Sequence, residues 1–93
     1  MKDLDPLLHN QLRLSIMSLL VQNDSVTFTH IVDKTGASRG NVSVQLTNLE
    51  ESGYLEMNKK FVGKKPQTSA SITPAGMMAM KEYTEALKSY LNL

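Results

Sequence analysis

Small hydrogen-bonding side chains recur along residues 39–52, and their spacing suits chemistry at the edges of nucleic acid bases. In a helix over this range, Val42, Leu46 and Leu49 share one apolar face and the polar side chains lie opposite. Arginine can bind a guanine edge with paired hydrogen bonds, asparagine can bind adenine similarly, and serine or threonine can bind bases or phosphates. The residues predicted to contact DNA from this helix are Ser38, Arg39, Asn41, Ser43, Val44, Thr47 and Asn48.

The same residues could instead form a polar face that meets only solvent. Two positions favour contact with DNA. Val44 would lie on this face without a role in the core, and its methyl groups could meet a thymine methyl. Gly40 weakens a helix by about 0.5–1 kcal/mol relative to alanine, a cost that makes sense where another molecule must approach the backbone closely. We therefore favour major-groove contact for this helix.

A second polar group lies in the segment 62–68, where glycine and proline mark a turn. Lysines there would neutralise phosphates, and neutral side chains would add hydrogen bonds to the backbone of DNA. Lysines at a turn also protect sheet edges from aggregation, so that alternative stays open. Of Lys59 and Lys60 just before it, only one can point to the DNA side, because side chains alternate along a strand. The DNA-binding residues predicted in the segment 62–68, the wing, are Lys64, Lys65, Gln67 and Thr68.

Capping residues and apolar spacing place the elements that would carry the first group. We expect a first helix over residues 4–22, followed by a very short strand at residues 26–27. A helix over 28–35 then begins at Thr27 and is closed by Gly36. Ser38 caps the next helix, which runs over 39–52 until Gly53. Two helices joined by about three residues form a helix-turn-helix.

The remaining elements are a hairpin and a last helix. Strands over 54–62 and 68–72 flank a turn at 63–67, and Thr73 with Pro74 begins a helix over 74–92. The fold class is mostly α with a small β-hairpin (α+β), in the order helix, short strand, helix, helix, strand, wing, strand, helix. The residues expected on the inner face of the hairpin are Leu55, Met57, Phe61, Ala70 and Ile72.

Length and composition indicate one domain over residues 1–93 and exclude several classes of protein. Apolar residues make up 41% and charged residues 20%, there is no cysteine, and the net charge is only +1. The segment from Lys34 to Lys65 contains six basic and three acidic residues, whereas the rest of the chain contains four basic and six acidic residues. The longest apolar runs are too short for a membrane span, and Asp3 and Asp5 replace the cationic start of a signal peptide. We expect a cytoplasmic protein.

No enzyme, metal or cofactor site is predicted. The serines lack a partnered base, and there is no glycine-rich phosphate loop. His9 and His30 stand alone, without further ligands at metal-binding spacing.

Surplus apolar surface on the first and last helices predicts a homodimer. The first helix carries two apolar stripes on different faces, and the last carries one with nearly heptad spacing. A single core of 93 residues cannot easily cover all three stripes. Packing of the last helix on the first within one chain is the alternative, and the two are compatible. The predicted interface residues are Leu7, Leu14, Met17, Met80, Tyr83, Leu87, Tyr90 and Leu91.

Five segments of the chain carry a resemblance to a known family. They are, in order, LRLSIMSLL (12–20), FTHIVDKTG (28–36), SRGNVSVQLTNLEESGY (38–54), FVGKKP (61–66) and ITPAG (72–76). Together they resemble the small winged-helix transcriptional regulators related to the MarR and ArsR groups. The resemblance spans nearly the whole chain. It implies a dimeric bacterial or archaeal regulator, often a repressor, that binds a pseudo-palindromic operator.

Two departures from these groups bear on function. The helix over 39–52 has no cation after Arg39, which predicts modest affinity for DNA, and the cysteine and histidine clusters of ArsR metal sensors are missing.

The predicted partners are double-stranded DNA, a second copy of the chain and an unidentified small-molecule effector, with no membrane. The alternative function is a winged-helix adaptor that binds proteins and no DNA, which the small net charge keeps open.

Overall fold

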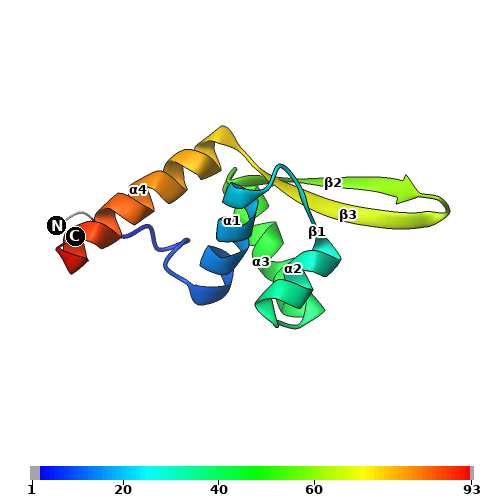
Figure 1. The fold of residues 1–93 in the computed structure, drawn as a ribbon, viewed down its shortest axis with the longest axis horizontal. Coiled ribbons are helices and arrows are strands. Elements are labelled where there is room, and N and C mark those ends of the chain that lie inside the picture. Colours follow the sequence, from blue (N-terminus) through cyan, green and yellow to red (C-terminus); the bar gives the residue numbers. More distant parts are fainter. Residues whose placement is uncertain (1–2, 93) are drawn as a thin grey trace.

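The structure, a computed structural model, describes residues 3–92 as four helices and three strands. Figure 1 shows α1, α2 and α3 forming a small body from which the β2–β3 hairpin and α4 project in opposite directions. The strands form one antiparallel sheet in the order β1-β3-β2. The predicted winged-helix fold is confirmed. The elements are α1 (Gln11–Gln22), β1 (Val26–Thr27), α2 (Phe28–Thr35), α3 (Arg39–Glu51), β2 (Leu55–Val62), β3 (Lys65–Ile72) and α4 (Pro74–Leu91).

Local capping builds the helix-turn-helix. The Thr27 hydroxyl accepts a hydrogen bond from the backbone N–H of His30 at the start of α2. Gly36 ends that helix with a left-handed φ of 71°, which glycine adopts without strain. The Ser38 hydroxyl then accepts from the backbone N–H of Asn41 and opens α3. These contacts confirm the predicted corner, and they fix the direction in which α3 leaves it.

One apolar core joins every element of the fold. Its members come from both sides of the helix-turn-helix and from the base of the sheet, so α3 is held against α1 and the hairpin root. Burial of this kind is the main source of stability in a small domain. The largest fully buried side chains are Leu8, Ile16, Met17, Leu20, Ile31, Val42, Leu49 and Leu55.

The first helix begins later than predicted, at Gln11 instead of residue 4. The side chain of Asn10 accepts from the backbone N–H of Arg13 and caps the helix there. The preceding residues form turns, in which the Asp5 carboxylate accepts from the backbone N–H of Leu7. Asparagine and aspartate compete with helical hydrogen bonds in this way. The predicted helix over 4–22 was therefore wrong for its first seven residues.

The second strand of the wing is longer, and the turn shorter, than predicted. Val62 pairs directly with Lys65, so the loop contains only Gly63 and Lys64, and Gly63 has a φ of 66°. A glycine with positive φ at the first loop position suits the twist of a two-residue hairpin. The expectation that Phe61 lies on a buried inner face was also wrong. Its side chain is 74% exposed, because the hairpin extends beyond the elements that cover its root.

Candidate nucleic-acid interface

Helix α3 turns its predicted DNA-binding residues away from the core. The buried side chains Val42, Leu46 and Leu49 hold one face of the helix, while Val44 on the opposite face is 56% exposed. Asn48 is half-buried, and the other predicted residues of this group, Ser38, Arg39, Asn41, Ser43 and Thr47, are exposed. A continuous polar surface with one exposed valine at its centre therefore faces solvent.

This surface has two edges with different neighbours. On one edge, Arg39, Ser43 and Thr47 line a groove of about 480 Å³ between α3 and the hairpin, which Lys59 and Thr68 also line. The other edge contains Asn41, Gln45 and Asn48 and faces the start of α1. The predicted DNA-binding residues of α3 are thus divided between the edge next to the wing and the edge next to α1.

Arg39 lies between α3 and the wing. Its guanidinium carbon lies 4.8 Å from the centroid of the Phe28 ring, a cation–π geometry. Arg39 also lines a second groove, of about 370 Å³, with Lys65, Gln67 and Thr68. The α3 and wing residues therefore meet at this arginine.

The register of the hairpin decides which wing residues face α3. Thr68 pairs with Lys59, and both line the groove beside α3. Gln67 pairs with Lys60, so its side chain starts from the other face of the ladder, and Gln67 lines the second groove with Arg39. Of the two lysines left open by the sequence, Lys59 is the one on the α3 side. The remaining lysines, Lys64 in the loop and Lys65 beside it, are exposed at the tip.

Charge is uneven along α3. Its N-terminal end carries Arg39 and the positive pole of the helix dipole, which favours phosphate. Its C-terminal end carries Glu50, which lines the groove next to the wing, and Glu51, which is exposed. Carboxylates repel phosphates, so the first half of the helix is the part suited to contact with DNA.

Two residues that the sequence analysis did not select also belong to this surface. Arg13 of α1 reaches α3, where its Nη1 donates to Oε1 of Gln45 at 2.6 Å, and its Nε donates to the backbone oxygen of Leu7 at 2.6 Å. Arg13 and Gln45 are 32 residues apart. No local pattern in the sequence connects two such residues, because their contact depends on how α1 packs across α3.

The predicted interface residues differ widely in exposure. Met17 is fully buried and Tyr83 is 6% exposed, so both already pack inside the monomer. Their side chains therefore join α1 and α4 to the core of one chain, the alternative that the sequence analysis kept open. Tyr90 and Leu91 at the end of α4 are 44% and 58% exposed. The other four, Leu7, Leu14, Met80 and Leu87, are half-buried.

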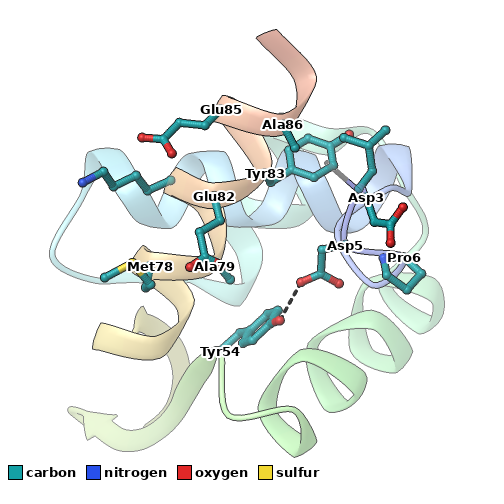
Figure 2. Close-up of a pocket in the computed structure, with 12 residues that line it drawn as sticks. Asp3, Asp5, Pro6, Tyr54, Met78, Ala79, Glu82, Tyr83, Glu85 and Ala86 are labelled. Atoms are coloured by element: carbon teal, nitrogen blue, oxygen red, sulfur yellow. Dashed lines mark hydrogen bonds between the residues drawn. The ribbon is translucent and has the colours of Figure 1, made fainter. Parts of the chain in front are cut away.

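A separate cavity of about 440 Å³ lies between α4, the turn after α3 and the N-terminal segment (Figure 2). The Tyr54 hydroxyl donates to Oδ2 of Asp5 at 2.6 Å across its floor. This hydrogen bond, followed by burial and the negative charges of Asp5 and Glu82, raises the pKa of Tyr54 to about 12. Nearby, His9 Nδ1 lies 3.1 Å from the Tyr83 hydroxyl. Both contacts fasten the N-terminal segment to the rest of the fold.

Among the helices within residues 3–92, none has the length and apolar character needed to cross a membrane.

Comparison with known proteins identifies the family. A model of the winged helix DNA-binding domain matches residues 12–91. The uncharacterized protein MJ0432 of Methanocaldococcus jannaschii is 31% identical over 71 residues, which are 76% of this chain and 77% of that protein. The structure of a transcriptional regulator homologue from Pyrococcus horikoshii OT3 is similar, with a TM-score of 0.85 and 28% identity, covering 92% of this chain and 85% of that one.

The fold is also shared with a regulator that has been solved on DNA. Bacillus subtilis PadR in complex with operator DNA gives a TM-score of 0.72 at 15% identity, over 81% of this chain and 47% of the PadR chain. At this identity the match shows the common fold. Because the family model spans nearly the whole chain and includes α3 and the wing, the chain belongs to the winged helix DNA-binding domain family.

Proposed function

We propose that the chain is a transcriptional regulator that binds double-stranded DNA sequence-specifically and acts as a repressor. Helix α3 enters the major groove and the wing binds the adjacent backbone. The observation that carries the proposal is the position of Arg39, which lines one groove with α3 residues and another with wing residues. Because Arg39 of α3 lines grooves with residues of both elements, α3 and the wing can contact DNA as one continuous interface.

The kind of contact follows from the side chains. The exposed Arg39 and Asn41 near the start of α3 would bind base edges, and the exposed Val44 would meet a thymine methyl. The lysines of the wing bind phosphates, which supply most of the affinity and a strong dependence on salt. Base contacts supply the smaller discriminating part of the free energy of binding.

The regulator would act as a homodimer on a pseudo-palindromic operator. Two recognition helices related by a twofold axis enter successive major grooves, about 34 Å apart along the DNA. The exposed Tyr90 and Leu91 at the end of α4 support assembly there, since large apolar side chains gain free energy when a second subunit covers them. The similar structure of the transcriptional regulator homologue from Pyrococcus horikoshii OT3 supports the regulatory role.

A titration of labelled duplex DNA followed by fluorescence anisotropy tests the proposal. We expect micromolar or tighter binding to random duplex at low salt, and tighter binding to duplexes selected from a random pool. Arg39→Ala should weaken binding to a selected site by about 1–3 kcal/mol and have a smaller effect on random DNA. Equal losses on both would show that Arg39 contacts phosphate and not bases.

A protein-binding adaptor is the second candidate. An exposed apolar patch formed by Val21, Met77 and Met78, at the end of α1 and the start of α4, favours it. Exposed apolar patches often mark protein interfaces. The same titration separates the two functions, because an adaptor would show no binding to duplex DNA at micromolar protein and low salt.

That a small-molecule effector binds the chain stays a prediction. The cavity of Figure 2 has a volume within the range of small-ligand sites, about 300–1,000 Å³. Its lining joins α4 to the N-terminal segment, so a ligand there would contact the elements next to the proposed dimer contact.

A further inference from the structure

A chain of side-chain hydrogen bonds runs from α1 along one edge of α3. Arg13 Nη1 donates to Oε1 of Gln45 at 2.6 Å, and Gln45 Nε2 donates to Oδ1 of Asn41 at 3.1 Å. Asn48 Nδ2 also approaches Oε1 of Gln45, at 3.4 Å. Arg13 itself is held by its second bond, to the backbone oxygen of Leu7 at 2.6 Å. Gln45 is thus the link between an anchored arginine and two asparagines on the proposed DNA surface.

The arginine fixes the direction of every bond in this chain. A guanidinium has only donors, so the atom of Gln45 that faces it must be the amide oxygen. The Gln45 amide nitrogen then faces Asn41, and a nitrogen donor requires the oxygen of Asn41 as its acceptor. Asn48 can meet the same Gln45 oxygen only through its own amide nitrogen.

We infer that Arg13 and Gln45 are specificity-determining positioning residues that set which atoms of Asn41 and Asn48 face DNA. This inference rests on the proposed function. With its oxygen held by Gln45, Asn41 turns its amide nitrogen outward and presents a hydrogen-bond donor. With its nitrogen held by Gln45, Asn48 presents its oxygen, an acceptor. Neither Arg13 nor Gln45 needs to touch a base for this effect.

The atom that each asparagine presents, donor or acceptor, determines which bases it can bind. A donor at Asn41 matches bases that offer acceptors in the major groove, of which guanine offers two, N7 and O6, and it mismatches the N4 amino group of cytosine. An acceptor at Asn48 matches cytosine N4 or adenine N6. Free asparagine would instead favour adenine through both of its atoms. The hydrogen bond from Gln45 to Asn41 therefore changes the base that Asn41 is expected to prefer from adenine to guanine.

The experiment is selection of bound duplexes from a random pool, followed by sequencing, for the intact protein and its variants. Comparison with Asn41→Ala identifies the base position that Asn41 contacts, as the position whose preference disappears. We expect that position to prefer guanine over cytosine by about fivefold or more in the intact protein, the low end of what one base contact contributes.

Gln45→Glu is the decisive variant. A carboxylate still accepts from Arg13, but it cannot donate to Asn41, so the Asn41 amide must turn and present its oxygen to DNA. The preference at the mapped position should then move from guanine to a base with an amino group, cytosine or adenine. Gln22→Glu, at the exposed end of α1, makes the same change in net charge and should leave the preference as it was.

Two further variants test the role of the arginine. Arg13→Lys keeps a donor toward Gln45 and should retain the guanine preference, whereas Arg13→Met removes the donor and should broaden it. Thermal unfolding of each variant confirms that it is folded. If Gln45→Glu binds DNA with an unchanged profile, or if Asn41→Ala changes no position, the inference is overturned while the proposed function stands. If the intact protein selects no DNA, both fail.

Discussion

Two helical glycines, Gly40 and Gly76, have opposite surroundings and should respond oppositely to alanine. A Cβ atom at Gly76 would collide with the backbone oxygen of Tyr54 and lie 2.9 Å from Cγ1 of Ile72, whereas one at Gly40 meets nothing within 4 Å. Gly76→Ala should therefore lower the free energy of unfolding by about 1–3 kcal/mol. Gly40→Ala should raise it by about 0.5–1 kcal/mol, as measured by denaturant unfolding.

Gly40→Ala also tests the DNA surface, because a methyl group there would obstruct a close approach of DNA to the backbone of α3. The more stable variant should bind DNA more weakly in the anisotropy titration. Unchanged or tighter binding would show that DNA does not approach α3 at Gly40.

The hydrogen bond between Tyr54 and Asp5 predicts a loss of stability at high pH. The pKa of Tyr54 is raised to about 12, from its ordinary value near 10, so the folded protein keeps a phenol proton that the unfolded chain releases. This stabilisation is fully present below pH 10 and is lost as the pH rises through 12. Because solvent screens the partly exposed phenol, we expect a contribution of about 1 kcal/mol.

Tyr54→Phe supplies the comparison for this titration. The free energy of unfolding of the intact protein should fall more steeply between pH 10 and 12 than that of the variant, as measured by urea unfolding at each pH. Parallel curves would mean that the Tyr54 proton is not linked to folding. Tyr90→Phe is a suitable control, since Tyr90 is exposed near the end of α4.

Among the elements, the wing should contribute charge but no base specificity. Lys64 sits in the two-residue loop at the tip of the hairpin. Lys64→Ala should weaken binding to selected and random duplexes alike and reduce the slope of log K against log salt by about 0.9, the value for one phosphate contact. Lys81→Ala removes the same charge from α4 and should leave the slope unchanged. A loss confined to the selected duplex would instead assign Lys64 to base contact.

The elements that the sequence located correctly are those whose signals are local. Ser38 and Thr73 each cap a helix within three residues, and both α3 and α4 begin where predicted. The start of α1 was missed because Asn10 provides a competing cap further along the chain. The length of the wing was missed because pairing register, and not turn composition alone, fixes where a loop ends.

The candidate site, like the elements, could be predicted from the sequence only where local patterns determine it. Periodicity identified the outward face of α3, since the spacing of Val42, Leu46 and Leu49 alone fixes which side is buried. It could not identify the contact of Arg13 with Gln45, which depends on the rotation of one helix against another. It also could not show that the guanidinium of Arg39 lies over the Phe28 ring. Sequence therefore located the exposed face of α3, which is the proposed recognition surface, and tertiary packing determines which atoms that face presents.

At the scale of the whole molecule, the proposed DNA-binding and assembly ends lie apart. The hairpin and α4 project in opposite directions, and the described residues extend 51 Å along the longest axis (Figure 1). A second subunit could therefore cover the end of α4 without obstructing α3 or the wing. Dimerisation and DNA contact should be separable by mutation.

The double variant Tyr90→Asp with Leu91→Asp tests this separation. Both side chains are exposed in the monomer, by 44% and 58%, so charges there should leave the fold intact and disfavour burial by a partner. The dimer dissociation constant, measured by sedimentation equilibrium, should rise by at least about tenfold, because each large apolar side chain contributes roughly 1.5–3 kcal/mol when buried. Ser89→Asp adds charge to the same turn without removing apolar surface, and it should have a smaller effect.

The same variants link assembly to operator binding. A dimer gains affinity from a second half-site because its second contact is intramolecular. The double variant should therefore lose affinity for a duplex with two half-sites, while its affinity for a single half-site stays that of the intact protein. Equal affinity of the intact protein for one and two half-sites would contradict a dimer on DNA. Loss of single half-site binding in the double variant would instead show that the end of α4 supports the recognition surface itself.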